Sequence, residues 1–412
     1  MNTNINYTPA PVPKNSFDPQ LCRWPISDTE LERRWKQIRE VMKQQNIDCL
    51  IAQNDHPYRC GMIRYIADVG FISNPVSVLF PQSGEMTILV HGGGPIAPGI
   101  PFWSLRGVQD VIGVPTLPTF NNAVNTQDAY VAVDLIKKRG YQKVGLLRPN
   151  SMLGLFHHRL LQGLEGCVEV CDITDEIDKI KAVKSEEELL YVQKCAVMAD
   201  AVMQALPSFI RPGVYEYEIK NYLTQTAANL GSLDQLVFVG SAPAEKRGGN
   251  KQHFYQNRRV EKGDQVFVML EANGPGGYWT ELARTYVLGK APKELKRVWD
   301  DAIQAQKYLA ALLQPGTSCA DVYCQYDEIV LKLGYQSDTR IPSHSQGYDL
   351  MERPGIRPDE TMDIEKNMNI AVHPTFGSET GWVFASDNYI TQADGPATLI
   401  HKYPQEIIEI GC

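Results

Sequence analysis

The chain has 412 residues, of which 43% are hydrophobic and 21% are charged, and its formal net charge is −8. The length fits two domains, and the composition is that of an ordinary globular protein. The negative charge argues against a protein that binds nucleic acid or an anionic membrane, because either partner needs a basic face. No apolar run approaches the ~20 residues that a membrane span requires.

The first twenty residues, MNTNINYTPAPVPKNSFDPQ, lack the apolar segment and the cleavage site of a signal peptide. We therefore expect an arm that is disordered or wraps the surface. The nine cysteines form no Cys-x-x-Cys pair, and we interpret them as buried, reduced thiols. Both features favour a cytoplasmic location.

Helices and strands alternate over the first part of the chain. Residues 27–46 predict a helix, since Ser27 and an acidic first turn precede apolar residues at helical spacing. Residues 47–53 predict a short buried strand, residues 75–90 two strands around a Gln-Ser-Gly-Glu turn, and residues 127–149 a helix followed by a strand. This alternation predicts a smaller α/β domain over residues 1–175. The adjacent His157 and His158 are expected on its surface.

The second part of the chain predicts a second domain, residues 176–412. Its start, residues 173–189, is charged and supplies a linker and the cap of a first long helix. Further helices are predicted at residues 217–230 and 292–313. Between them, residues 265–270 predict an apolar strand, residues 273–277 a Gly-rich turn, and the segment ending in ARTYVLG a second strand. Together these predict a β-hairpin.

Several segments of the second part follow one another in the order of a known superfamily. They are residues 177–202, 211–219, 253–264, 263–289, 341–356 and 367–391. In GDQVFVMLEANGPGGYWTELARTYVLG, RPGVYEYEI and IPSHSQGYDLMERPGI the chain resembles the superfamily of creatinase, aminopeptidase P, prolidase and methionine aminopeptidase. The resemblance implies an α/β protein with a pita-bread C-terminal domain and a smaller N-terminal α/β domain.

The metallopeptidases of this superfamily hold two metal ions, and the resemblance places their ligand positions on this chain. Those positions carry Leu270, Glu281, His344, His373, and Ser386 or Asp387. Leu270 cannot bridge two cations, and Glu271 beside it is expected on the opposite face, because side chains alternate along a strand. Since two adjacent cations need several carboxylates, we expect no dinuclear centre.

Two interpretations of the remaining polar residues stay open. In the first, Glu281, His344 and His373 hold one divalent transition-metal ion that keeps open positions. In the second, no cofactor is bound and the histidines act directly as general acid, general base and substrate clamps. Creatinase gives the precedent for chemistry without a metal on this fold. His253 lies close to the substrate-contacting histidine of the superfamily and is expected in the same cleft, although each histidine alone also fits an ordinary core or surface position.

Four aromatic residues surround the same positions in the sequence. They are Trp279, Tyr348, Trp382 and Phe384. We expect them as walls of the substrate cleft, with Asp387 as a further polar contact, although the aromatic residues also fit an ordinary core.

The segment NDHPYRCGMIRYIADVGF resembles the part of the N-terminal domain that reaches the active site of the partner subunit in a homodimer. It makes Arg59, together with His56 and Tyr58, a candidate for contact with substrate across the subunits. An ordinary surface loop is the alternative.

These residues predict an enzyme that acts on a small, polar, nitrogen-containing molecule. By the resemblance, the default reaction is hydrolysis of a C–N bond without a metal or with one metal ion, in place of the dimetal peptidase reaction. A lyase that uses the same histidines for proton abstraction is the first alternative, and an inactive binding or scaffold protein is the second. The expected partners are a small-molecule substrate and a second copy of the chain, with no nucleic acid and no membrane.

Overall fold

The fold is described by a computed structural model, which covers residues 7–54, 61–70, 75–92, 99–114, 127–148 and 154–411. The chain divides into two compact units, residues 1–181 and 182–412. The division lies at the end of helix α5 (Thr174–Ala182), whereas the boundary expected at residue 175 falls at the start of that helix.

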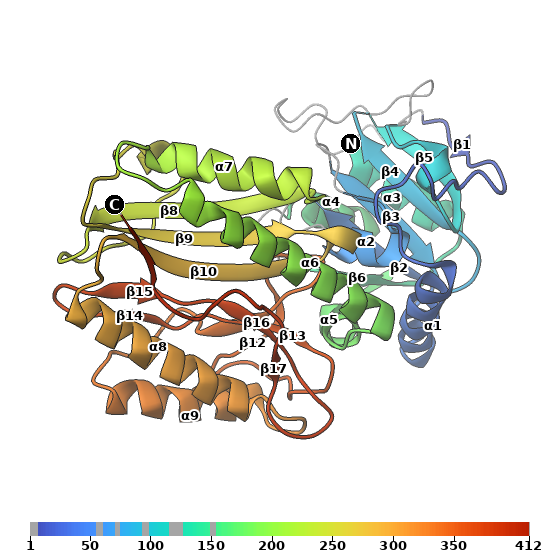
Figure 1. Ribbon diagram of the computed structural model, residues 1–412. Helices are drawn as coiled ribbons and strands as arrows, with labels where there is room; N and C mark the ends of the chain where they lie inside the picture. Colours follow the sequence, from blue (N-terminus) through green and yellow to red (C-terminus); the bar gives the residue numbers. More distant parts are fainter. Residues whose placement is uncertain are drawn as a thin grey trace. The chain divides into compact units, whose positions relative to one another are not determined.

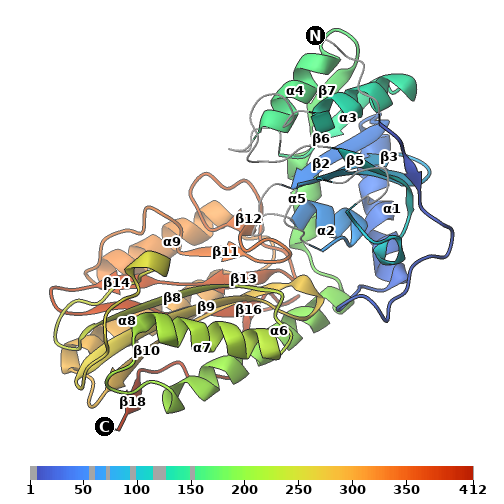
Figure 2. The same ribbon diagram turned by 90° about the horizontal axis from the view of Figure 1, so that it is seen from above.

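The first unit is built on a seven-stranded mixed sheet with the strand order β1-β5-β4-β3-β2-β6-β7 (Figures 1 and 2). The strands are β1 (Ala10–Pro11), β2 (Cys49–Asn54), β3 (Val76–Pro81), β4 (Met86–His91), β5 (Val108–Val114), β6 (Lys143–Leu146) and β7 (Glu169–Asp172). The other helices are α1 (Asp28–Gln44), α2 (Gly61–Ala67), α3 (Gln127–Lys138) and α4 (Leu155–Leu164). Ile51, Leu79 and Ala132 belong to the core between the sheet and helices α3 and α4.

The local sequence explains these elements, and the helices and strands predicted for this unit are confirmed. Ser27 caps α1, because its hydroxyl accepts a hydrogen bond from the N–H of Glu30 (3.1 Å). One prediction is wrong: His157 is buried, with its ring edge-on to Phe156 at 5.3 Å between centroids. The reason is helical spacing, since positions 157, 160 and 164 of α4 all face the core while His158 is exposed.

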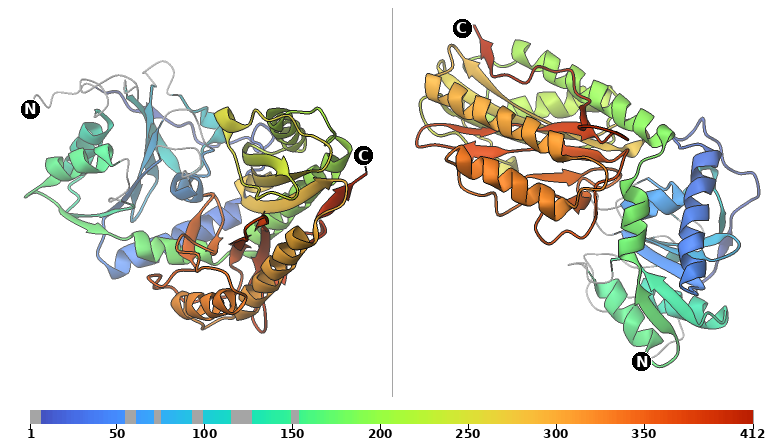
Figure 3. Two further views of the ribbon diagram at one scale, coloured as in Figure 1. Left: turned by 90° about the vertical axis from the view of Figure 1, so that its left-hand side faces the viewer. Right: turned by 90° about the horizontal axis from the view of Figure 1, so that it is seen from below.

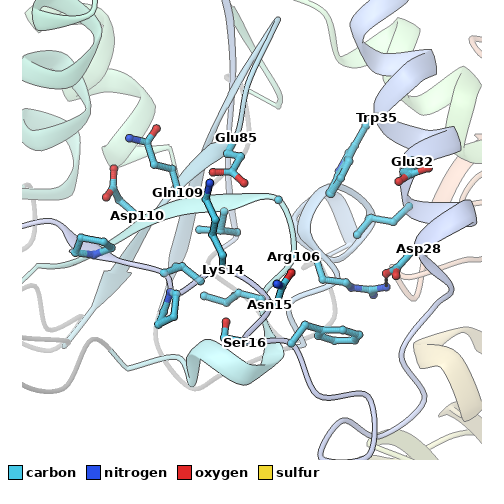
Figure 4. Close-up of a pocket in the computed structure, with 18 residues that line it drawn as sticks. Lys14, Asn15, Ser16, Asp28, Glu32, Trp35, Glu85, Arg106, Gln109 and Asp110 are labelled. Carbon is cyan, nitrogen blue, oxygen red and sulfur yellow. Dashed lines mark hydrogen bonds and ion pairs between the residues drawn. The ribbon is translucent and has the colours of Figure 1, made fainter.

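The N-terminal arm wraps the surface of the first unit from residue 7 onward. β1 pairs antiparallel with β5, and the guanidinium of Arg106 lies over the ring of Phe17 (4.3 Å) and binds Asp28 (2.7 Å). An open hollow of about 900 Å³ remains between the arm, α1 and β5 (Figure 4). Its lining mixes Lys14 and Arg106 with Asp28, Glu32, Glu85 and Asp110, so its charge favours no class of ligand.

The second unit consists of two sheets between two pairs of helices (Figures 1 and 3). One sheet has the order β18-β10-β9-β8 and packs against α6 and α7, and the other has the order β12-β11-β13-β16-β17. Helices α8 and α9 pack against the second sheet and the small hairpin β14–β15. This α-β-β-α order of layers encloses a polar region between the two sheets.

The elements of the second unit have the following bounds. The helices are α6 (Glu186–Ala205), α7 (Glu216–Asn229), α8 (Lys293–Leu312) and α9 (Cys319–Lys332). The strands are β8 (Asp234–Pro243), β9 (Asp264–Asn273), β10 (Trp279–Leu288), β11 (Ser343–Ser345), β12 (Glu352–Gly355), β13 (Asn369–Val372), β14 (Thr375–Gly377), β15 (Trp382–Phe384), β16 (Asp387–Ile390), β17 (Thr398–Leu399) and β18 (Ile408–Ile410). The helices predicted at residues 217–230 and 292–313 are confirmed as α7 and α8.

Strands β9 and β10 form the predicted hairpin. The turn between them contains Gly276 and Gly277 with φ angles of 75° and 87°, which glycine adopts more readily than other residues. Along β9, Val268 and Leu270 pack against the helices, whereas Glu271 points toward the second sheet and accepts a hydrogen bond from the side chain of Gln346 (3.3 Å).

Helix α6 together with the short 3-10 turn that follows it, Glu186–Ser208, is long and apolar enough to cross a membrane by length and composition alone, although the sequence was expected to contain no such run. Its burial explains this composition. Cys195, Ala199 and Val202 are buried in the core that α6 shares with β9 and β10, which is the packing of a core helix in a globular domain.

The cysteines among the described residues are all free thiols, as expected. Cys49, Cys195 and Cys319 are buried, whereas Cys167 and Cys324 are exposed, so the expectation of burial holds for only some of them.

Candidate functional site

Three titratable side chains meet between the two sheets of the second unit. Glu281 comes from β10, His344 from β11, and His373 directly follows β13. One potential ligand atom from each lies within 4.8 Å of the other two. Nε2 of His344 is 3.9 Å from Oε2 of Glu281, and the two imidazole rings are 5.0 Å apart between centroids. All three side chains are buried.

Pairing within and between the sheets fixes these positions. His344 pairs with Ala371 in the antiparallel ladder of β11 and β13, which brings its ring close to the residue that follows β13. The backbone N–H of Glu281 donates to Oδ1 of Asn388 (2.7 Å), and Ala283 forms an isolated bridge with Ser386. These contacts join β10 to β16, so Glu281 of one sheet faces the histidines of the other.

Several polar atoms at this site have no partner among the described residues. They include Oε1 of Glu281 and Nδ1 of His373, both buried, whereas the hydroxyl of Ser386 lies close enough to Glu281 to offset part of the rise that burial causes in the pKa of that carboxyl group. Buried polar atoms are nearly always satisfied in native proteins, so this group has the character of a set of ligands. Two imidazoles and one carboxylate suit a divalent transition metal such as zinc, iron or manganese.

The protonation of the histidines also suits metal ligation. Burial lowers the pKa of His344 to about 4. Burial and the neighbouring ring of His344 lower the pKa of His373 well below its usual range. Nδ1 of His344 lies 3.0 Å from the carbonyl oxygen of Ser345, which leaves its Nε2 directed toward Glu281. Both rings are therefore neutral at pH 7, the form in which imidazole binds metals.

Glu271 is a site residue that the sequence analysis missed. It lies directly opposite Glu281 in the β9–β10 register, whereas Leu270 pairs with Leu282 and packs among the core residues under the helices. Leu270 therefore does not point into the site. Burial and the charge of Glu281 raise the pKa of Glu271 well above its usual range, and burial raises the pKa of Glu281 to about 7.

The expectation about Leu270 and Glu271 is thus corrected. The two residues do face opposite sides of β9, but it is Glu271 that faces the site. A spacing counted along the sequence cannot establish which residues pair across a turn. The register of Glu271 with Glu281 was the missing information.

His253 is not part of this buried group. It lies on the short 3-10 helix η4 (His253–Tyr255) with its side chain exposed and a φ angle of 44°. The expectation that it shares the buried cleft is not supported. His56, Tyr58 and Arg59 lie outside the described residues.

Asp387 is buried and engaged by neighbouring side chains. Its carboxylate forms a fully buried ion pair with Arg284 (2.7 Å) and accepts further hydrogen bonds from the side chains of Gln306 (3.2 Å) and Gln405 (3.1 Å). This network engages both carboxylate oxygens, so the structure gives no support to the expected substrate contact. Ser386, beside it, lies at the site instead.

The four aromatic candidates divide into two groups. The ring of Phe384 stacks on His373, with centroids 5.4 Å apart and an angle of 7° between the planes. Phe384 and Trp382 also line an open hollow at this end of the unit. Trp279 and Tyr348 are buried and do not line that hollow, and Tyr348 packs on Tyr278 at 4.4 Å.

Comparison with known proteins identifies the fold and a family to which most of the second unit is similar. Residues 191–393 match the metallopeptidase family M24. This match covers most of the second unit. Among solved structures, the Xaa-Pro dipeptidase from Bacillus anthracis superimposes with a TM-score of 0.72 at 20% identity, over 92% of this chain and 99% of that one. The pita-bread fold with an N-terminal domain and a catalytic-type C-terminal domain, expected from the sequence, is confirmed.

Two curated relatives show how distant the similarity is. The "Uncharacterized peptidase YqhT" of Bacillus subtilis is 23% identical over 281 residues, which cover 67% of this chain and 77% of the relative. The "Xaa-Pro dipeptidase" of Pyrococcus furiosus is 25% identical over 243 residues, covering 57% and 68%. The chain is therefore only distantly similar to these proteins, and it carries His373 and Ser386 where the resemblance places ligands of a dimetal site.

Proposed function

We propose that this protein is a hydrolase of the M24 type that cleaves a C–N bond in a small, polar, nitrogen-containing molecule and that holds one divalent transition-metal ion on Glu281, His344 and His373. The convergence of these three buried ligand atoms within 4.8 Å carries the proposal. Relatives named as peptidases and as a dipeptidase support hydrolysis as the reaction. Metal-free chemistry by the histidines is the alternative that the experiments below distinguish.

A divalent ion bound there supplies Lewis acidity, which polarises a carbonyl group and makes a water molecule more acidic near neutral pH. The residues of the chain supply the geometry. The carbonyl of Ser345 holds His344, and the ring of Phe384 covers His373 on one face. Asn388 holds the backbone of Glu281. These contacts fix the three ligands before a substrate binds.

Glu271 is the group we assign to proton transfer. It lies outside the three-ligand set but opposite Glu281, and Gln346 donates one hydrogen bond to its Oε2 (3.3 Å). Burial and the charge of Glu281 raise the pKa of Glu271, which favours its protonated form. A protonated carboxyl group next to the reacting bond can donate its proton to the nitrogen that leaves, as general acid catalysis requires.

The substrate is proposed to differ from those of the dimetal peptidases. A pair of bridged cations needs several carboxylates, but the positions of His373 and Ser386 offer an imidazole and a hydroxyl. One divalent ion held by one carboxylate and two neutral imidazoles has a net positive charge, whereas the carboxylates of a dimetal site neutralise most of the charge of its ions. The substrate group that binds best is therefore expected to differ in charge between the two kinds of site. By the resemblance, we further propose a cytoplasmic homodimer.

The test is a screen for turnover with protein loaded separately with zinc, manganese, cobalt or iron(II). The panel contains dipeptides, small amides, amidines and guanidines, and the reactions run in water enriched in ¹⁸O. Hydrolysis incorporates one ¹⁸O atom into the carbonyl product, whereas an elimination does not. Label in the product and loss of turnover in Glu281→Gln support the proposal.

Three outcomes contradict it. Product without label indicates a lyase, and full activity in the presence of a strong chelator indicates metal-free chemistry. Absence of turnover on the whole panel, together with absence of metal binding, favours a binding or scaffold protein.

A further inference from the structure

The second unit contains an open hollow of about 740 Å³ beside the candidate metal site. Its walls are the segment of residues 334–340, the hairpin of β14 and β15, and residues from the loop that follows β8. The lining includes two arginines, Arg247 and Arg340, together with the amide of Asn250. The hollow is thus both accessible to solvent and rich in hydrogen-bond donors.

Phe384 connects this hollow with the site. Its ring lines the hollow and also stacks on His373. Arg340 lines the same hollow as Phe384. A molecule lying in the hollow therefore contacts Arg340 and the ring of Phe384, which separates it from His373.

The two arginines lack carboxylate partners. Within the described part of the chain, neither Arg247 nor Arg340 forms an ion pair or a side-chain hydrogen bond, and both are exposed. The guanidinium of Arg247 lies over Gly377, where its Nη2 is 3.0 Å from the point that a Cβ atom would occupy. A side chain larger than glycine at this position would displace Arg247 from the wall.

Neighbouring arginines of the same unit behave differently. Arg297 is bound by Glu294 (2.8 Å), and Arg357 is bound by Asp359 (2.7 Å). Of these four arginines, only Arg247 and Arg340, which line the hollow, have guanidinium groups that are free to bind a ligand. Guanidinium groups bind carboxylates through paired, charge-assisted hydrogen bonds, so this arrangement fits an anion.

The acidic residues of the hollow limit the charge of that anion. Asp338 and Glu379 also belong to its lining, and Oδ1 of Asp338 accepts a hydrogen bond from the backbone N–H of Arg340 (2.9 Å). Two cations and two anions leave the lining without net charge. A monoanion is therefore favoured over a phosphate group, which carries more charge and would meet both carboxylates.

We infer that Arg247 and Arg340 form a carboxylate-binding subsite, so that the substrate carries a carboxylate group on the side of its C–N bond that faces the hollow. The inference rests on the proposed function only in placing the reacting bond at Glu281, His344 and His373. Anion binding itself can be measured without turnover.

The experiment compares the binding of N-acetylglycine with that of its neutral analogue N-acetylglycinamide and with inorganic phosphate. The full-length protein as purified, Arg340→Gln, Arg247→Gln and the control Arg211→Gln are each titrated by ligand-observed NMR. Arg211 is exposed and lies outside the hollow, and the Arg211→Gln substitution removes the same charge as the two hollow variants. We expect the wild type to bind N-acetylglycine roughly tenfold more tightly than the amide, since a charge-assisted hydrogen bond contributes about that factor.

Arg340→Gln and Arg247→Gln should each lose most of this preference, whereas Arg211→Gln should keep it. Equal binding of acid and amide, an unchanged preference in both hollow variants, or tighter binding of phosphate would overturn the inference. The metal content of each variant is measured in parallel. A normal metal content without anion preference refutes the subsite alone, whereas anion preference without any metal binding refutes the metal proposal and leaves the subsite standing.

Discussion

Glu271 and Glu281 lie opposite each other on β9 and β10, and only 5% and 2% of their surfaces are exposed. Burial raises the pKa of both carboxyl groups, and the charge of Glu281 raises that of Glu271 further. Without a cation, the pair therefore carries less than two negative charges at neutral pH. A cation bound next to Glu281 stabilises the ionised carboxylates and so lowers their pKa values. Metal binding is therefore expected to release protons.

The first prediction concerns stability and pH. The pKa of Glu281 rises from 4.5 to about 7 on folding, so the folded metal-free protein holds a proton that the unfolded chain has already released. Stability is then lost as the pH rises from about 4.5 to 7. Glu281→Gln removes this loss and should be more stable than the wild type at pH 8, by an amount on the order of 3 kcal/mol, with little difference at pH 4.5.

Urea denaturation in the presence of a chelator measures this difference. The histidines act in the opposite direction, since depressed pKa values cost stability as the pH falls, but their contribution is common to both proteins. Saturating metal should reverse the order at pH 8, because an ion that binds only the folded state stabilises the wild type. If the metal-free wild type is more stable than Glu281→Gln at pH 8, the pKa of Glu281 is not raised by burial in the folded protein.

The second prediction separates proton transfer from metal binding. Glu271→Gln should retain one bound ion per chain, because Glu271 is not one of the three clustered ligands. Turnover should fall by ~10²- to 10⁴-fold, the usual contribution of a general acid. The matched control is Glu245→Gln, at an exposed position of the same unit. Loss of metal together with activity would make Glu271 a ligand and not a proton donor.

The third prediction concerns His373. His373→Ala should abolish turnover and weaken metal binding, while the thermal midpoint of the metal-free protein stays nearly unchanged. Nδ1 of His373 has no partner among the described residues, so the substitution breaks no hydrogen bond at that atom. A structural buried histidine would instead cost about 1–3 kcal/mol through unsatisfied partners. Full activity with a lowered midpoint would refute the assignment.

Asp387 gives the contrasting fourth prediction. Asp387→Ala leaves the buried guanidinium of Arg284 without its counter-ion, and such a loss costs about 3–5 kcal/mol. We expect a lower midpoint in thermal and urea unfolding even in the presence of a chelator. A substitution that changed substrate affinity and left stability intact would restore Asp387 as a substrate contact.

The sequence predicted the secondary structure well because its signals are local. Ser27 caps a helix, and the Gly-rich turn joins two apolar strands, each within a few residues. The partners of the site are distant in sequence. Arg284 and Asp387 are separated by 103 residues, so no local pattern reveals their ion pair.

The candidate site was only partly predictable for a related reason. The resemblance supplied His344, His373 and Glu281, whose proximity depends on the order of strands in two sheets. It could not supply the register that brings Glu271 into the site, because a count of residues across a turn leaves the pairing undefined. The exposure of His253 likewise depends on the path of a loop, which spacing does not determine.

The most direct test of the single-metal site is the number of ions bound per chain. Isothermal titration of metal-depleted protein with Zn²⁺ or Mn²⁺, checked by elemental analysis, should give one tight site in the wild type and in Glu271→Gln. Glu281→Gln and His344→Ala should each lose most of this affinity, and binding to the wild type should release protons. Two tight ions per chain, or unchanged affinity in Glu281→Gln, would contradict the single metal site on Glu281, His344 and His373.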